Sequence, residues 1–263
     1  MKPFYVDEND NTYLGEEAEK RLEGRNDLRF FRKREGVLEV DETRWKQAQQ
    51  YERRTWMEAQ GLAAREDRNT EHEIHFDHYA AIAGSQFDSA LEIGCGPFTN
   101  LAHVLGHVTA KRVTLLDPLI NDYVKHPNCS YRDGTLAGTP ATLVPQPIEG
   151  FQTTERFDLV VMINVLEHCY SLPRVFERID SLVAPNGILV FHDKLIPASS
   201  IDEFVHNIFD AGHPIRVADE VILRFLAGYQ ELYSKHVEIP LEDYMAYTFD
   251  SLYFIGRKSP RAS

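Results

Sequence analysis

Cysteine is scarce in this chain, and its spacing excludes two common kinds of site. Three cysteines occur in 263 residues, at Cys95, Cys129 and Cys169, and no two of them have Cys-x-x-Cys spacing. An odd number of widely spaced cysteines argues against a disulfide framework and against a zinc ribbon. We therefore expect free thiols and a reducing, cytoplasmic location.

Long apolar runs are also missing. No stretch approaches the roughly 18 consecutive apolar residues that a membrane-spanning helix needs. The first residues, 1–11, contain acids where a secretory signal would be apolar. The sequence thus predicts a soluble, unprocessed chain with no membrane partner.

Positive charge is in deficit, with a formal net charge of -13. Such a charge raises the electrostatic cost of approaching a phosphate backbone, whose neutralisation normally supplies much of nucleic-acid affinity. We therefore expect a small-molecule partner and no nucleic acid. The sequence leaves open whether the chain forms a homodimer.

What the sequence does contain is an alternation of apolar strands and helical stretches from about residue 85 onward. The strands are expected at 90–93, 113–116, 130–132, 157–163 and 187–192, and the helices at 99–105, 173–183 and 219–228. Strands separated by helices imply right-handed crossovers and a doubly wound, mostly parallel α/β sheet. Two last strands with no helix between them, at 236–239 and 251–255, predict an antiparallel edge.

Residues 1–84 are rich in charge and predict a mostly helical N-terminal extension or cap. Their best helix is 42–60, which places Trp45 and Trp56 near one face. We interpret that face mainly as docking onto the core, with a lid over a substrate pocket as the alternative. The expected division is the extension 1–84, a core at 85–258 and a flexible tail at 259–263.

The most informative segment is an apolar strand that breaks into a glycine turn at Gly94 and Gly96, followed by a second strand that ends in Asp117. Glycines at the carboxyl end of a strand let the backbone approach a ligand, and the acid can accept hydrogen bonds from a ribose diol. The pair predicts a nucleoside-containing cofactor.

The spacing of the turn decides between cofactors. Dinucleotide enzymes use a third glycine, which the run 94–99 lacks, and Glu92 would repel a pyrophosphate but suit a sulfonium or ammonium charge. A nicotinamide-dependent reductase is therefore a disfavoured alternative. With Glu92, Gly94, Gly96 and Asp117, the stretch resembles the class I S-adenosylmethionine-dependent methyltransferases. The resemblance implies a Rossmann-like fold.

The resemblance also assigns residues to S-adenosyl-L-methionine. It implies that the glycine backbone lies against the cofactor, that Glu92 faces its aminoacyl end, and that Asp117 takes the ribose hydroxyls. For Asp117 a helix N-cap is the alternative, and for the Asp133 acceptor of the adenine amino group the alternative is a simple turn. The expected cofactor-binding residues are Glu92, Gly94, Gly96, Asp117, Pro118, Asp133, Gly134 and Asn164.

The segment 163–168 resembles the Val-Leu-Glu-His segment of many methyltransferases that act on small molecules. By that resemblance, Glu167 and His168 turn toward the reacting methyl group. Methyl transfer needs a base only when the nucleophile keeps its proton, and imidazole titrates near working pH. His168 is thus the candidate base, with His192 at the end of the next strand as a competitor, and His168 could instead be a helix-start residue satisfied by the backbone.

Two further segments are candidates for the acceptor pocket. In the acid-rich and histidine-rich run 71–78, His75 shares a helical face with His72 and Tyr79, which favours a pocket-lining helix over an ordinary surface helix. The segment 212–216 resembles the His-Pro segment that borders the acceptor pocket in sugar and natural-product methyltransferases. The expected substrate-binding residues are Glu167, His213, Tyr79 and His75.

A divalent metal beside the cofactor is not favoured, and we expect none. The residues that could hold one are Glu167, His168, His192 and Asp193. However, Asn164 stands where the RNA-type members of the resembled family carry a further glutamate.

The sequence therefore predicts an S-adenosylmethionine-dependent methyltransferase of a small molecule, such as a natural product, a sugar or another secondary metabolite. Oxygen is the expected acceptor atom. The alternatives are nitrogen, carbon, or a homologue that binds the cofactor without catalysis.

Overall fold

The computed structural model describes residues 4–6, 12–14, 16–17, 20, 32–34, 36–40, 42–57, 67, 69–199, 212–239 and 249–259. Within these ranges, none of the helices combines the length and the apolar character that crossing a membrane requires.

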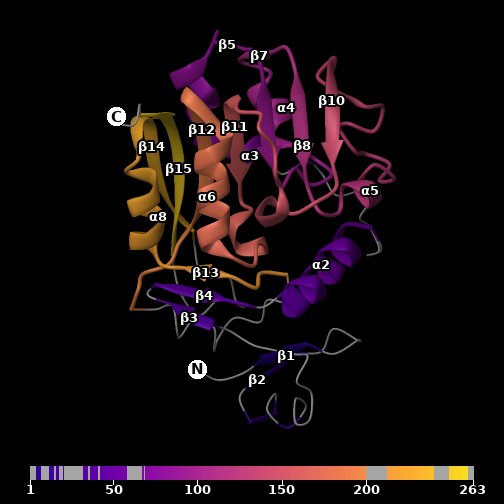
Figure 1. The fold of residues 1–263 in the computed structure, drawn as a ribbon, viewed down its shortest axis with the longest axis vertical. Helices are drawn as coiled ribbons and strands as arrows, with labels where there is room; N and C mark the ends of the chain where they lie inside the picture. Colours follow the sequence, from indigo (N-terminus) through magenta and orange to yellow (C-terminus); the bar gives the residue numbers. More distant parts are fainter. Residues whose placement is uncertain are drawn as a thin grey trace.

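An eight-stranded sheet forms the centre of the molecule (Figure 1). Its strands in spatial order are β14 (Tyr229–Ile239), β15 (Phe249–Lys258), β12 (Val183–Leu195), β11 (Phe157–Ile163), β6 (Ala90–Ile93), β8 (Val113–Leu116), β10 (Thr139–Val144) and β9 (Thr135–Leu136). The five strands from β12 to β10 are parallel, while β15, β14 and β9 are antiparallel to their neighbours. The predicted Rossmann-like sheet with an antiparallel edge is confirmed.

Helices cover both faces of the sheet. Alternate residues of a strand point to opposite faces, and the central strands have apolar residues on both, so both faces need a cover. Leu91 and Ile93 of β6 join one core cluster with α6 (Leu172–Leu182) and α8 (Asp219–Leu226). Ala90 joins the other cluster, with α4 (Asn100–Val104) and the aromatic residues that follow α3 (Asn69–His75). The central strands are therefore buried on both faces, as their continuous apolar runs predict.

The strand expected at 130–132 is wrong. These residues form turns, and the third parallel strand is β10, which pairs with β8 from Ala141 to Val144. Buried Tyr131 instead donates its hydroxyl to the carbonyl of Gly96 at 2.7 Å, so it supports the glycine turn from outside the sheet.

The described residues of the N-terminal extension form both helices and short strands. The helix α2 (Glu42–Met57) is present, and the proposed end of this helix near residue 60 lies outside the described residues. Among the residues described before it are the short strands β1 (Phe4–Val6), β2 (Thr12–Leu14), β3 (Arg32–Arg34) and β4 (Val37–Glu39). Strands of three residues are too short to show a periodicity in the sequence.

The strand β4 makes two contacts with the core. The strand β4 pairs with β13 (Arg216–Val217), and buried Glu39 accepts the backbone N–H of Leu172 at 2.7 Å, at the start of α6. An acid at a helix start satisfies an orphan donor and complements the helix dipole. The strand β4 is thus fixed to the core by a strand pair and a helix cap.

The remaining short elements connect these units: β5 (Gln86–Phe87), β7 (Thr109–Ala110), α5 (Ile120–Tyr123), η2 (Asp77–Ile82), η3 (Ile148–Gly150) and η4 (Leu166–His168).

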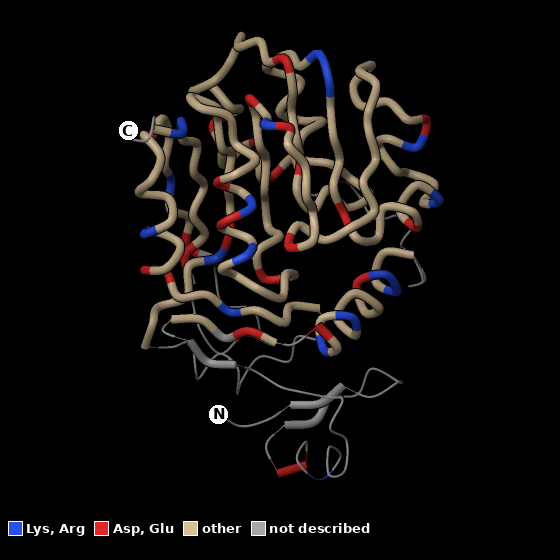
Figure 2. The backbone as a smooth tube through the Cα atoms, viewed as in Figure 1, with Lys and Arg blue, Asp and Glu red and all other residues tan. Residues whose placement is uncertain are grey.

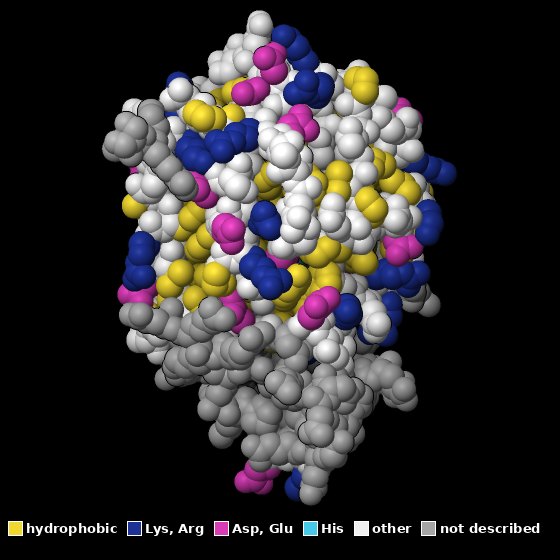
Figure 3. Space-filling model, viewed as in Figure 1, with side chains coloured by type: hydrophobic (Ala, Val, Ile, Leu, Met, Phe, Trp, Pro, Cys, Tyr) yellow, Lys and Arg dark blue, Asp and Glu magenta, His cyan; other side chains and the backbone are white. Residues whose placement is uncertain are grey.

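Figure 2 shows charges of both signs along α2 and α6, and Figure 3 shows Lys and Arg interspersed with Asp and Glu on the face covered by α6 and α8.

Candidate functional site

A cavity of about 740 Å³ opens at the carboxyl ends of the central parallel strands. It lies where the strand order reverses, between β6, whose crossover leads to β8, and β11, whose crossover leads to β12. Ligands of open α/β sheets bind at this point of the topology. The loops that follow β6, β8, β10 and β11 line it, and α2 and α3 contribute further walls.

The glycine turn lines the cavity as predicted. Gly94 has φ of 68°, and a Cβ built on it would lie 2.4 Å from Cγ1 of Val165. Gly96 has φ of 54° and open space where its Cβ would be. Both residues adopt the left-handed conformation that glycine tolerates best, but only Gly94 is also required by close packing.

Asp117 follows β8 and presents its carboxylate to the same cavity. Its Oδ2 accepts the N–H of Gly96 at 3.1 Å and its Oδ1 accepts the N–H of Leu119 at 2.8 Å. Each carboxylate oxygen keeps a second acceptor site. Burial raises the pKa of Asp117 to about 6, and the two backbone hydrogen bonds only partly oppose this effect.

Glu92 has a different role from the one that the resemblance implies. It is buried and does not line the cavity. Its Oε1 accepts the N–H of Asn100 at 2.8 Å, and its Oε2 accepts the N–H of Leu101 at 3.2 Å. Glu92 thus caps the N-terminus of α4, where Thr99 also accepts the N–H of Ala102.

Asp133 and Gly134 lie away from the cavity, because the strand expected before them is absent. Asp133 is exposed and accepts the N–H and the hydroxyl of Thr135, as in an ordinary polar turn. The loop after β10 takes the place expected for them: Gln146 and Pro147 line the cavity. The loop after β10 lies here because β10, and not residues 130–132, is the third parallel strand.

Pro118 and Asn164 line the cavity, as the resemblance implies. Asn164 follows β11 with φ of 57°, a conformation that asparagine tolerates better than most residues. Its N–H donates to the carbonyl of His192 at 3.0 Å. The turn after β11 is therefore fixed to the end of β12.

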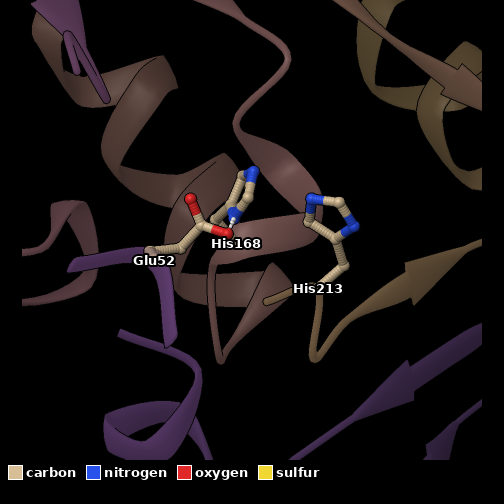
Figure 4. A group of neighbouring side chains, drawn as sticks. All are labelled: Glu52, His168 and His213. Atoms are coloured by element: carbon tan, nitrogen blue, oxygen red, sulfur yellow. Dashed lines mark ion pairs between the residues drawn. The ribbon is translucent and has the colours of Figure 1, made fainter. Parts of the chain in front are cut away.

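His168 lies at the cavity wall between Glu52 and His213 (Figure 4). Its Nδ1 is 3.1 Å from the carbonyl oxygen of Gly212 and 3.8 Å from Oε1 of Glu52. A carbonyl only accepts, so Nδ1 carries hydrogen, and in the neutral ring the lone pair is on Nε2. The hydrogen on Nδ1 is therefore held by the Gly212 carbonyl, and the Glu52 carboxylate lies beside the ring.

Glu167 does not line the cavity but lies behind it. Its Oε1 accepts Nζ of Lys194 at 2.5 Å and is 3.5 Å from Nε2 of His213. Burial opposes ionisation, yet the charges of His213 and Lys194 hold the pKa of Glu167 well below its ordinary value. Glu167 therefore positions two residues that do line the cavity, rather than contacting a substrate itself.

His192 lies at the inner end of the cavity. Its Nε2 is 2.8 Å from Oγ of Ser251, and its ring packs against those of His72 and Tyr253 at centroid distances of 4.6 and 4.3 Å. Burial, followed by the charges of His72 and Lys194, holds its pKa well below the ordinary value. The ring is neutral at physiological pH.

The residues of the run 71–78 lie in two environments, some at the cavity and some outside it. His72 and His75 line the cavity. Tyr79 does not, because the backbone leaves the helix at Asp77, where φ becomes positive, and its side chain is buried against Phe76. The expectation that Tyr79 contacts a substrate is therefore wrong.

The four residues that we considered as metal ligands are not gathered into one set. Glu167 binds Lys194, and Asp193 accepts the N–H of Leu166 at 2.8 Å, while burial and the nearby charge of Glu167 raise its pKa. The structure instead groups Glu52, His168 and His213, whose ligand atoms lie within 4.8 Å of one another.

Glu52 and Lys194 are cavity residues that the sequence analysis missed. A signal for Glu52 was present: Trp45, Gln49, Glu52 and Trp56 recur at helical spacing, so a polar pair shares the tryptophan face. This face docks onto the core and also lines the cavity. Trp45 donates its indole N–H to the carbonyl of His168 at 3.0 Å, and both tryptophans line the cavity.

A family model described as a methyltransferase domain matches residues 47–239. None of the curated proteins compared with the sequence matches it.

Several solved structures share the fold. N-methyltransferase NodS from Bradyrhizobium japonicum WM9, solved with S-adenosyl-L-homocysteine, is 20% identical, with a TM-score of 0.57 over 81% of this chain and 100% of that one. A SAM-dependent methyltransferase from Leishmania major is 15% identical, with a TM-score of 0.56 over 97% and 96% of the two chains. The 1,6-didemethyltoxoflavin-N1-methyltransferase from Burkholderia thailandensis is 15% identical, with a TM-score of 0.52 over 85% and 95%.

Proposed function

Because this chain belongs to the methyltransferase domain family, we propose that it moves the methyl group of S-adenosyl-L-methionine to a hydroxyl oxygen of a small molecule and releases S-adenosyl-L-homocysteine. The observation that carries the proposal is that one cavity contains both the Asp117 carboxylate beside a glycine turn and the oriented imidazole of His168. The first feature suits a nucleoside, and the second suits removal of a proton from an acceptor.

The cofactor half of the site consists of the segments after β6, β8, β10 and β11. Asp117 would accept the ribose hydroxyls with the two acceptor sites that its backbone donors leave open. The backbone at Gly96 lets the ligand approach without a side chain in the way. Gln146 would replace Asp133 as the polar group near the adenine.

The chemical step needs alignment and one proton transfer. The acceptor oxygen attacks the methyl carbon as the carbon–sulfur bond breaks, and the electron pair of that bond stays on sulfur. The hydroxyl proton passes to Nε2 of His168, and Glu52 then stabilises the imidazolium. His192 is the weaker candidate base, because its pKa is depressed.

The dimensions and walls of the cavity favour a small acceptor. Its volume is within the roughly 300–1,000 Å³ typical of small-molecule sites. Two tryptophans and several imidazoles line it, and these groups stack on planar rings and hydrogen-bond to hydroxyls. We propose no nucleic-acid partner, consistent with the net charge of -13.

Nitrogen is the second candidate acceptor. Two proteins of similar fold, NodS and the 1,6-didemethyltoxoflavin-N1-methyltransferase, are named as N-methyltransferases. An amine that is already neutral needs no strong base, so its methylation would depend little on His168. The two acceptor classes are therefore distinguished by the effect of replacing this histidine.

The first experiment is thermal unfolding alone and with S-adenosyl-L-homocysteine, S-adenosyl-L-methionine or NADH. A ligand at roughly 100 times its dissociation constant adds about 2.7 kcal/mol to the free energy of unfolding. We expect stabilisation by the two sulfur nucleosides only, followed by methyl gain in an acceptor screen read by mass spectrometry. Stabilisation by NADH alone, or by none of the three, would contradict the proposal. Binding without turnover on any acceptor would favour a non-catalytic homologue.

A further inference from the structure

A second group of imidazoles and carboxylates lies where α3 packs against α4, outside the cavity. Glu73 is at its centre: Oε1 is 2.7 Å from Nε2 of His107 and 3.4 Å from Nδ1 of His78, while Oε2 is 2.8 Å from Nδ1 of His103. None of these four residues lines the cavity. The methyltransferase chemistry gives the group no role.

One oxygen of Glu73 is held in place by a relay. His103 contacts Glu73 through Nδ1 and Asp67 through Nε2, both at 2.8 Å, so both ring nitrogens donate to carboxylates. A carboxylate that binds a metal is normally oriented in this way by hydrogen bonds to its other oxygen. The relay orients Oε1 toward His78 and His107.

The backbone brings His78 into the group by an unusual turn. Asp77, His78 and Tyr79 all have positive φ, between 50° and 54°, which ends α3 and reverses the chain. The side chain of His78 is 61% exposed, so solvent reaches the group, whereas Glu73 is only 20% exposed. One side of the group is open and the other is fixed by the protein.

We propose that Glu73, His78 and His107 bind a four-coordinate divalent transition metal such as Zn²⁺, with water as the fourth ligand. One donor atom from each residue lies within 4.8 Å of the others. In a tetrahedral site with bonds of about 2.0 Å, the donors are roughly 3.3 Å apart, so small side-chain rotations suffice. Two imidazoles and a carboxylate are the ligand types that zinc accepts.

The charge balance also suits a cation. His103 bridges two carboxylates as an imidazolium and so offsets one of them, which leaves one negative charge facing His78 and His107. The metal would take the place of the hydrogen between each of these imidazoles and Oε1, and the hydrogen of each neutral ring would move to its other nitrogen. Water, entering from the exposed side, would complete the shell.

Such a site would fasten α3 and the turn after it to the segment that follows α4. The opposite side of α3 carries His72 and His75 into the cavity. The metal would therefore hold a wall of the acceptor pocket from outside, without contacting the cofactor or the acceptor.

The test is metal binding by the full chain without a polyhistidine tag, after treatment with a chelator. Calorimetry with Zn²⁺ and the visible spectrum with Co²⁺ are compared for the wild type, His78→Gln, His107→Gln and Glu73→Gln. His236→Gln, an exposed histidine outside the group, is the matched control, and His168→Gln reports on binding inside the cavity. Stabilisation by S-adenosyl-L-homocysteine checks that each variant is folded.

We expect one equivalent of metal, a tetrahedral Co²⁺ spectrum, and an affinity at least about 100-fold lower in His107→Gln and Glu73→Gln. His236→Gln and His168→Gln should bind as the wild type does. No binding by the wild type would overturn the proposal, and so would binding that survives the substitutions at Glu73 and His107. Loss of binding in His168→Gln alone would assign the metal to the cavity and also overturn it.

Discussion

Oε1 of Glu52 lies 3.8 Å from Nδ1 of His168, and this ion pair joins the N-terminal helix α2 to the turn after β11. Neither residue is placed by the central sheet alone. The carboxylate comes from the segment before the core, while the imidazole comes from the core. The proposed acid–base pair therefore exists only when α2 is docked.

Replacing His168 tests the base. We expect His168→Ala to lower kcat on a hydroxyl acceptor by about 10²- to 10⁴-fold at neutral pH, with recovery at high pH as the acceptor ionises unaided. Glu52→Gln should lower kcat less, since it removes only the stabilisation of the imidazolium. Steady-state kinetics over a pH range measure both effects. Unchanged kcat in His168→Ala would indicate a nitrogen acceptor or another base.

Binding of S-adenosyl-L-homocysteine should depend on the ionisation of Asp117. Burial raises the pKa of this acid from 3.8 to about 6, so the carboxylate that accepts the ribose hydroxyls is present above pH 6 and lost below it. We expect affinity to be constant above about pH 7 and to fall toward tenfold per pH unit below pH 6. Calorimetric titration of the wild type and Asp117→Asn provides the test: the variant should bind weakly, with a flat pH profile in this range.

Two glycine substitutions separate the effect of close packing from that of backbone strain. Gly94→Ala places a Cβ 2.4 Å from Val165 at φ of 68°, so we expect a loss of about 2–4 kcal/mol in the free energy of unfolding. Gly96→Ala has similar backbone strain but open space around its Cβ, and should cost only about 1–2 kcal/mol. Urea denaturation measures both losses. If the two variants were equally stable, the contact with Val165 would not be limiting.

Glu92 distinguishes a cofactor contact from a helix cap. Glu92→Ala leaves two buried N–H groups of α4 without their acceptor, so we expect a loss of about 2–4 kcal/mol in stability. At temperatures where the variant is fully folded, its affinity for S-adenosyl-L-homocysteine should stay within a few-fold of the wild type. A large loss of affinity in a stable variant would restore the role that the family resemblance implied.

The sequence predicts best where local pattern and tertiary environment agree. The strand β11 was expected at 157–163 and lies there, because a strand buried on both faces reads as a continuous apolar run. The glycine turn and Asp117, predicted as cofactor-binding residues, lie at the cavity. Their conformational and chemical demands are visible in a few adjacent residues.

The wrong predictions have one cause in common, because each depends on the conformation of the folded chain, which no local sequence pattern shows. The strand β10 was missed because it is alternately exposed and contains a proline, so pairing with β8 decides its conformation. Tyr79 was assigned to a helical face that ends at Asp77, where left-handed backbone reverses the chain. Glu92 fitted the family motif, but its partners are two backbone groups of α4, which only the folded chain brings to it.

The indole N–H of Trp45 donates to the carbonyl of His168, so residues from both the N-terminal extension and the core form the wall of the cavity. A chain trimmed to its recognisable core would keep the sheet and the nucleoside half of the site. It would lose Glu52, both tryptophans and the α3 histidines together. Such a fragment would keep the cofactor half of the cavity but lose a large part of the wall that we propose to contact the acceptor.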